Sequence, residues 1–353
     1  MSRARSTFAA ACLLASAAAV AHHSPAAFDM SRQVTIAGTV ASFEWANPHA
    51  YLSVRDDADG RTWRLELLSP ANLKQYGWTE ATLAKGDRVT VTASPSRTAD
   101  RTTGYLQSIE KAGSVLYANP RAGAGAAPPT AGAPGGPPRS AAGSAQPGGA
   151  PAPRAQSLAG TWATLPGPAL PQLLNDAAKL PTTPRGAAAI SSFTDAAANP
   201  SRDCVPYSVP LYMILPIYRR IEIAGDAIVI RGEEGNVDRT VHTNRSTHAG
   251  GAESLLGDSI GHFEGDALVV DTALFAEHGM GNAAGLPAST RKHLVERFEL
   301  TPDRAALTYT FTLEDPEYLT APVQGTARWA YRPEVTYAPI ACDLENARRF
   351  LQD

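Results

Sequence analysis

Three histidines near the N-terminus could bind a transition metal. His22 and His23 follow Ala-Val-Ala at 19–21, which has the small-residue pattern of a signal-peptide cleavage site. If the chain is cut after Ala21, His22 becomes the mature N-terminus, and its free amine and ring Nδ1 can chelate one metal ion. A third nitrogen from another histidine would complete a T-shaped site, which suits copper among the divalent metals.

His49 could supply that third nitrogen. It lies in the stretch NPHAYL, where Asn47-Pro48 favours a turn between the first two expected strands. A side chain in such a turn need not be buried in a barrel. Asp29 or Glu44 could act as an oxygen ligand or orient a histidine. The alternative is that the terminal pair forms a polar chain end and His49 caps the turn.

A second pattern resembles a catalytic motif. Residues 257–261 read GDSIG, which matches the G-x-S-x-G pattern of serine hydrolases. That motif needs a strand, a tight turn and a helix to expose its serine, here Ser259. The following residues instead indicate a strand and an EGDA hairpin turn. A hydrolase that uses Ser259 is therefore only the third-ranked function, and we assign no catalytic residue.

Five further histidines are spread over the second half of the chain. They are His242, His248, His262, His278 and His293. The first two are six residues apart, which is neither a helical nor a short-loop spacing for a metal site. His278 and Met280 in FAEHGMG could favour copper. This number of histidines is ordinary for such a length, so a metal site among them is the less favoured interpretation.

The first 21 residues are interpreted as a secretory signal peptide. Arg3 and Arg5 precede an apolar run at 8–20 that is too short to span a bilayer. We expect cleavage after Ala21 and a periplasmic or secreted location. No other stretch is long and apolar enough to be a transmembrane segment. The net charge of −3 gives no basic excess for nucleic acid.

Cleavage would leave two cysteines, Cys204 and Cys342. In an exported chain such a pair most simply forms one disulfide. On chain-entropy grounds, this cross-link would contribute about 4–5 kcal/mol to stability. The alternative is a pair of free buried thiols.

Composition divides the chain into four parts. Residues 118–157 are almost all Ala, Pro, Gly and Ser, with no acidic or aromatic residue, which predicts a disordered linker. We therefore expect a signal peptide at 1–21, an OB-like β-barrel domain at 22–117, the linker, and an antiparallel β domain at 158–353. The length of the linker favours two independent domains.

The first domain is predicted to be a five-stranded OB-like barrel. VTIAGTV alternates apolar and polar residues and then slips in phase, which indicates a strand with a bulge. Asp59-Gly60 predicts a hairpin turn. Ser69 and Pro70 suit the N-cap and first position of a short helix. Five strands with one helix between the third and fourth give the OB order.

The second domain is predicted to be a larger antiparallel meander, or lipocalin-like barrel, of about eight strands. Two stretches share the layout strand, Gly-Asp-Ala turn, strand. VPYSVPLYMILPIY holds three prolines, which exclude a regular central strand and predict a plug or cover. Aromatic side chains either fill the barrel, which is the favoured interpretation, or line a ligand cavity. The cavity candidates are Trp162, Tyr218, Phe263, Tyr309 and Trp329.

Several motifs carry a resemblance to known families. In the first domain they are AHHS at 21–24, EWANPHAYL at 44–52, ELLSPANL at 66–73 and KGDRVTV at 85–91. On these, the domain resembles a family of secreted bacterial proteins of unknown function. GHFEGDALVVDT at 261–272, LEDPEYLTAP at 313–322 and CDLENARRF at 342–350 resemble a second uncharacterised exported β module. The resemblance implies an envelope location and small β domains, and it carries no catalytic residues.

These observations predict an exported bacterial envelope protein with a non-enzymatic binding role. The most specific form is copper binding through His22 and His49, with His23 nearby. The competing hypothesis is a lipocalin-like carrier of a small apolar ligand or a scaffold for an envelope partner.

Overall fold

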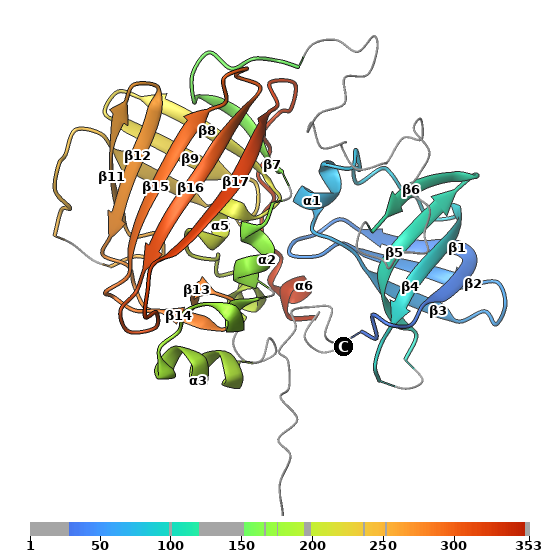
Figure 1. The fold of residues 1–353 in the computed structure, drawn as a ribbon. Coiled ribbons are helices and arrows are strands. Elements are labelled where there is room, and N and C mark those ends of the chain that lie inside the picture. Colours follow the sequence, from blue (N-terminus) through green and yellow to red (C-terminus); the bar gives the residue numbers. More distant parts are fainter. Residues whose placement is uncertain are drawn as a thin grey trace, which may run out of the picture.

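The computed structural model describes residues 28–98, 101–119 and 152–349, apart from short gaps at 166, 175, 194–198, 236 and 251–252. The described residues form two β units with a few short helices (Figure 1). The expected signal peptide, His22, His23 and most of the predicted linker lie outside the described residues.

The first β unit is a five-stranded barrel with a further strand at one edge. Its strands are β1 (Val34–Glu44), β2 (Tyr51–Asp56), β3 (Thr62–Glu66), β4 (Arg88–Pro95), β5 (Thr103–Lys111) and β6 (Ser114–Ala118). In this described part of the chain the order is β3-β2-β1-β4-β5-β6, and a parallel β3–β5 pairing closes the barrel. Helix α1 (Pro70–Lys74) lies between β3 and β4 in sequence. The predicted OB-like arrangement is confirmed.

Local sequence signals in this unit also agree with the structure. The register of β1 against β2 shifts between Val40 and Ser42, which is the expected bulge. Gly60 adopts a φ of +74° in the hairpin between β2 and β3. Ser69 caps α1, since its side chain accepts a hydrogen bond from the Asn72 backbone N–H.

The second β unit is a closed barrel. Its strands are β7 (Gly160–Leu165), β8 (Tyr218–Ala224), β9 (Ala227–Gly232), β10 (Asp238–His242), β11 (Asp258–Glu264), β12 (Ala267–Ala273), β15 (His293–Leu300), β16 (Ala306–Glu314) and β17 (Val323–Tyr331). Within the described residues their order is β10-β11-β12-β15-β16-β17-β7-β8-β9. Neighbouring strands are antiparallel, except that β10 and β11 pair in parallel through two residue pairs.

The barrel has nine strands where the sequence predicts about eight. The unpredicted strand is β10, whose two inward positions hold Arg239 and Val241. With one apolar residue on its buried side, β10 lacks the alternation that marks a strand in sequence.

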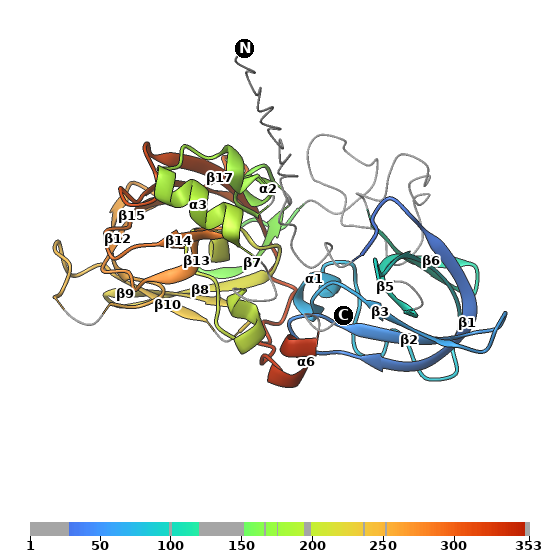
Figure 2. The same ribbon diagram turned by 90° about the horizontal axis from the view of Figure 1, so that it is seen from below.

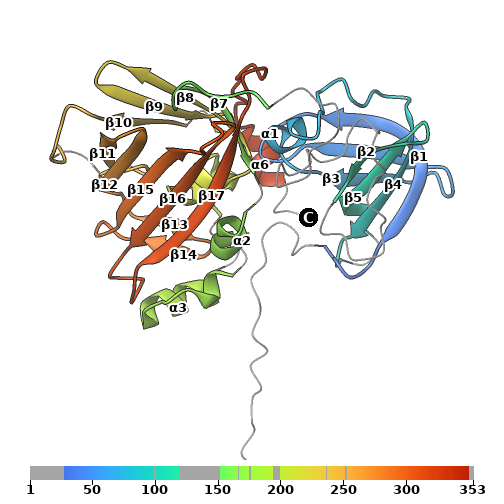
Figure 3. The same ribbon diagram turned by 45° about the horizontal axis from the view of Figure 1, so that its top comes forward.

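Short helices and one hairpin lie at an end of the barrel (Figure 3). They are α2 (Ala169–Leu174), η2 (Ala177–Lys179), α3 (Pro184–Ser192), and the hairpin of β13 (His278–Ala283) and β14 (Leu286–Ala288). The remaining helices are η3 (Pro200–Asp203), α5 (Leu211–Ile214) and α6 (Leu344–Arg349). All four residues of α5 are buried in the barrel's hydrophobic cluster, as expected for a plug. No helix in the described ranges is long and apolar enough to cross a membrane.

Side chains fill the interior of the barrel. Trp162, Tyr309 and Trp329 are fully buried, and the rings of Tyr309 and Trp329 stack with centroids 5.8 Å apart. Tyr218 is also buried. Phe263 does not line the interior, because it is 46% exposed. Phe263 lies beyond the two β11 residues that pair with β10, so none of the described strands pairs with that edge of β11 at Phe263.

The two β units contact each other, contrary to the expected independence. The Gln75 side-chain amide donates to the Pro216 carbonyl at 2.5 Å, and the Asn47 amide donates to the Ile340 carbonyl at 2.9 Å. Helices α1 and α6 both lie in this region between the units (Figure 2). The sequence did not indicate these contacts, because each is made by a single amide side chain in an irregular segment. Such a residue produces no periodic pattern in the sequence.

The predicted disulfide between Cys204 and Cys342 is present, with a Cα–Cα distance of 5.7 Å. It joins the end of η3 to the C-terminal segment, which runs between the two units. That segment also forms a bridge from Cys342 to Asn47 of the first unit. The disulfide therefore anchors the chain segment on which part of the contact between the units depends.

Candidate functional site

His49 lies at the contact between the two units and has an oriented imidazole ring. Its Nδ1 is 3.0 Å from the Leu67 carbonyl oxygen and 3.2 Å from Oε1 of Glu66. Both partners accept hydrogen bonds, so Nδ1 carries the ring proton and the neutral tautomer has its lone pair on Nε2. Metal-binding histidines have this arrangement, with a carboxylate or carbonyl on the nitrogen that faces away from the metal.

The backbone of the first barrel fixes this contact. Glu66 ends β3 opposite Tyr51, and the ladder continues as the Leu67 N–H donates to the Ala50 carbonyl at 2.9 Å. His49 therefore follows the turn beside the end of β3. The Glu66 side chain is 4% exposed and that of His49 is 22% exposed.

Glu66 is an orienting carboxylate that the sequence did not suggest. Of the two that it did suggest, Asp29 accepts hydrogen bonds from the side chain and backbone of Ser31, and Glu44 ends β1. The signal for Glu66 is its place in LELL, where an acidic residue interrupts a buried apolar run. A buried carboxylate needs a partner, and His49 provides one.

The second unit adds two glutamates to this region. Glu233 is fully buried, and its Oε1 lies 3.2 Å from Nζ of Lys74 in α1. Burial raises the pKa of Glu233, and Lys74 opposes this rise. Burial also raises the pKa of Glu234, while the charge of His49 acts to lower it. One glutamate of each unit therefore interacts with His49: Glu66 lies 3.2 Å from its Nδ1, and Glu234 is influenced by its charge.

We expect Lys74→Met to lower the free energy of unfolding by about 1–3 kcal/mol at pH 8, because buried Glu233 loses its charged partner. The folded-state pKa of Glu233 is raised already and would rise further. The contribution of Glu233 to the free energy of unfolding is therefore fully present below its unfolded-state pKa. It is lost as the pH rises through its folded-state pKa. Urea unfolding should give a larger loss at pH 8 than at pH 4.5.

Lys85→Met is the matched control for this prediction, since Lys85 is an exposed lysine of the same unit. It should change stability by no more than about 0.5 kcal/mol at either pH. Equal losses from the two substitutions at pH 8 would contradict an energetic role for the Lys74–Glu233 pair.

A narrow cleft opens beside this cluster, with a cavity volume of ≈ 30 Å³, or room for about one water molecule. It is lined by Asn47, Pro48, Ser201, Cys204, Val205, Pro206, Tyr207, Tyr212, Leu215, Glu234, Gly235 and Cys342. This volume is far below the several hundred Å³ of a typical small-molecule pocket. The feature that bears on chemistry here is the imidazole rather than the cleft.

Among the residues that the structure describes, no group of three His, Cys, Asp or Glu side chains is arranged to hold a metal ion. His49 contributes one nitrogen. The other two predicted ligands, His22 and His23, lie outside the described residues.

Ser259 faces the barrel interior from β11. Its hydroxyl accepts from Nε of Arg239 at 3.2 Å and lies 3.0 Å from the Thr272 hydroxyl. The motif is part of a strand, and the EGDA hairpin follows it, as the sequence indicated. Ser259 therefore belongs to a buried polar network and lacks the strand-turn-helix setting of a nucleophile.

The histidines of the second half are not all scattered. His278 is buried in β13, where its Nδ1 accepts from the Met280 backbone N–H at 3.1 Å. Burial and the nearby charge of Lys292 lower the pKa of His278 to about 4. His248 and His293 lie on either side of Asp271, which sequence spacing did not indicate.

Comparisons with known proteins bear mainly on the first unit. Residues 10–105 match the model of a family of unknown function, DUF6152. This match agrees with the resemblance carried by the HHS and NPH motifs. No curated protein shows a significant match to the chain.

Two solved structures show limited similarity. The mitochondrial single-stranded DNA-binding protein of S. cerevisiae has 16% sequence identity over 23% of this chain and 94% of that chain, with a TM-score of 0.19. A luciferase domain from the dinoflagellate Lingulodinium polyedrum has 14% identity over 54% of this chain, with a TM-score of 0.22. The match spans 48% of the luciferase domain. At these TM-scores neither similarity bears on what this chain does.

Proposed function

We propose that the protein is an exported envelope protein with a non-enzymatic role, and that its first unit binds copper. The ligands are the N-terminal amine and ring nitrogen of His22, produced by cleavage after Ala21, and Nε2 of His49. His23 lies next to this site in sequence. The location follows from the signal-peptide pattern and from the envelope location that the family resemblance implies.

The oriented imidazole of His49 is the observation that supports this proposal. Glu66 and the Leu67 carbonyl both contact Nδ1, and in this orientation a metal would be bound by Nε2. Glu66 beside the ring and the electrostatic interaction with Glu234 favour a positive charge at this position. A site with one amine and two imidazole nitrogens binds Cu²⁺ more tightly than it binds the other first-row divalent ions.

A copper titration of the exported protein tests the proposal. Mass spectrometry first establishes the cut between Ala21 and His22. The mature chain is expected to bind one Cu²⁺, and a chain with one glycine before His22 should bind at least about tenfold more weakly. Glu66→Gln should weaken binding by about 10- to 100-fold, because it removes the carboxylate that fixes the His49 ring.

His262→Ala is the matched control, because His262 is a histidine on the second unit with a 65% exposed side chain. It should bind copper as the unaltered chain does. Equal affinity of the glycine-extended and authentic chains would refute the chelate, and normal binding by His49→Ala would refute the role of His49.

The packed interior of the second barrel counts against the carrier hypothesis. The three cavity candidates that are fully buried, Trp162, Tyr309 and Trp329, pack in the hydrophobic core. A ligand would have to displace these side chains, and disrupting a well-packed core in this way costs free energy.

A further inference from the structure

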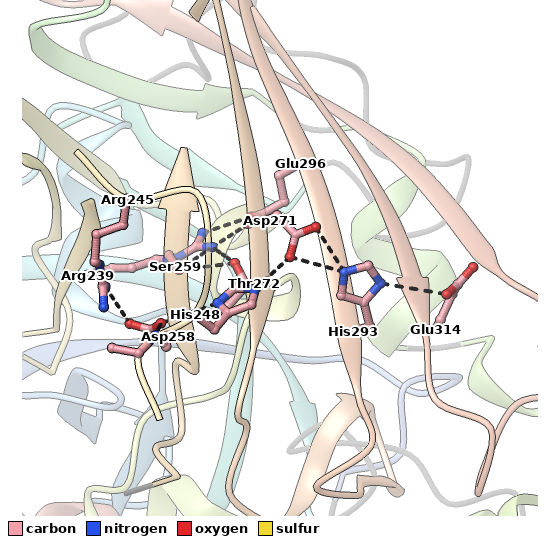
Figure 4. A network of polar contacts seen from close by, with 11 residues as sticks. Arg239, Arg245, His248, Asp258, Ser259, Asp271, Thr272, His293, Glu296 and Glu314 are labelled. Carbon is pink, nitrogen blue, oxygen red and sulfur yellow. Dashed lines mark hydrogen bonds and ion pairs between the residues drawn. The ribbon is translucent and has the colours of Figure 1, made fainter. Parts of the chain in front are cut away.

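A row of ionisable side chains crosses the outer face of the second barrel (Figure 4). Asp258, Asp271, His293 and Glu314 come from β11, β12, β15 and β16, which are neighbours in the sheet. His293 lies directly opposite Glu314, and Asp271 pairs with Val295, two residues along from His293 on the same face. The strand register therefore gathers residues that are far apart in the sequence.

His248 joins this row from the loop between β10 and β11. Its Nε2 lies 2.9 Å from Oδ1 of Asp271. Nε2 of His293 lies 3.1 Å from the same oxygen and 3.2 Å from Oδ2. Two imidazole nitrogens thus converge on one carboxylate from opposite sides.

The other ring nitrogens also face carboxylates. Nδ1 of His248 is 3.3 Å from Asp258, and Nδ1 of His293 is 3.7 Å from Glu314. Asp258 accepts hydrogen bonds from Arg245 Nη2 at 2.8 Å and from the Ala249 N–H at 3.1 Å. The same carboxylate faces Nδ1 of His248 and fixes the orientation of that ring.

The Nε2 atoms of His248 and His293 both face the Asp271 carboxylate. A neutral imidazole carries one N–H, so a ring that donates from Nδ1 presents a lone pair at Nε2. Three carboxylates surround the two rings, and Arg245 is the cation that pairs with Asp258 at 2.8 Å. A cation between the two Nε2 atoms and Asp271 would turn these lone pairs into ligands.

We propose that His248, His293 and Asp271 form a binding site for a divalent transition metal of the Zn²⁺ class. Two imidazoles and one carboxylate are a common zinc donor set with the fourth position open to water. Asp258 and Glu314 then form carboxylate–histidine–metal triads that orient the rings. This site lies on the second unit and uses none of the copper ligands proposed above.

The side chains need only a small rearrangement to admit the ion. As they stand, no three of the described His, Cys, Asp and Glu side chains surround a common point. The nitrogen–oxygen distances of 2.9 and 3.1 Å are nevertheless close to the roughly 3.3 Å between neighbouring ligand atoms in a tetrahedral zinc site. Exposed fractions of 23% for His248, 39% for His293 and 44% for Asp271 leave room for rotation and a path for the ion.

Zinc titration of the full exported chain carrying His49→Ala tests this site apart from the copper site. Calorimetry should show one Zn²⁺ bound. Adding His248→Ala or His293→Ala should weaken binding by at least about tenfold, and adding Asp258→Asn should weaken it by about 10- to 100-fold. His262→Ala, on the outer part of β11, should leave the affinity unchanged.

Thermal unfolding gives a second measurement that also checks folding. Zn²⁺ should raise the Tm of the His49→Ala chain but not that of the chain that also carries His293→Ala, because only a folded site binds the ion. Co²⁺ in place of Zn²⁺ should give the intense visible absorption of a tetrahedral site. No zinc binding in the His49→Ala chain, or equal binding after His293→Ala and His262→Ala, would overturn the proposal.

Discussion

Glu296→Gln is expected to lower the free energy of unfolding by about 3–5 kcal/mol, the usual cost of removing one partner of a buried ion pair. Glu296 and Arg239 face each other inside the second barrel, and their side chains are 0% and 2% exposed. Arg239 Nη1 donates to Oε1 of Glu296 at 2.9 Å, and the Tyr309 hydroxyl donates to the same oxygen at 2.8 Å. The substitution leaves the guanidinium charge buried without its counterion.

The same pair explains why Arg239 stays charged. Burial alone would lower the pKa of Arg239, but the adjacent Glu296 carboxylate more than offsets this, and the pKa is raised overall. Chemical denaturation of the variant and the unaltered chain in parallel measures the loss. Replacing both partners by methionine should be much less destabilising, since it removes both charges together.

Glu299→Gln is the matched control, because Glu299 lies on the same strand with a 58% exposed side chain paired to Arg297. Exposed pairs of this kind contribute little, so the change should stay within about 0.5 kcal/mol. If Glu296→Gln cost no more than Glu299→Gln, the buried pair would have no special energetic role.

Loss of the Cys204–Cys342 disulfide should lower stability by about 5 kcal/mol. The two cysteines are 138 residues apart, so the cross-link removes a large loop-closure entropy from the unfolded chain. The reduced protein should unfold at a clearly lower denaturant concentration than the oxidised protein. The C-terminal segment should loosen first, since the disulfide anchors it beside Asn47.

The variant with both Cys204→Ser and Cys342→Ser provides the control for this experiment. Its unfolding should match that of the reduced protein, and adding a reducing agent should not change it further. An oxidised and a reduced chain with the same unfolding midpoint would contradict the prediction.

The sequence was most informative where local chemistry determines structure. The bulge in β1, the turn at Gly60 and the cap at Ser69 each follow from residues close together in the chain, and all are present. The OB-like order followed from the number of strands and the position of one helix. The disulfide was also predictable, because Cys204 and Cys342 are the two cysteines outside the expected signal peptide.

Residues that act through long-range pairing were not predictable in this way. Glu66 and His49 meet because two strand ends lie side by side, and His248 meets Asp271 because a long loop folds back over the sheet. The spacing of these residues along the chain does not predict either contact. Strand β10 was not predicted, because the charged residue Arg239 occupies a buried position that is usually apolar in a strand.

The parallel seam between β10 and β11 has a consequence for how the second barrel opens. This seam consists of two residue pairs, Val241 with Ser259 and His242 with Ile260, whereas each other seam of the described barrel has at least four. Local opening here breaks fewer pairs between strands than opening at any other seam of the described barrel, so we expect hydrogen exchange to be fastest at this seam. The bonds from Arg239 to Ser259 and Thr272 cross the same seam from inside. These side-chain bonds add to the two backbone pairs that hold β10 against β11, and the ion pair with Glu296 fixes the Arg239 side chain that makes them.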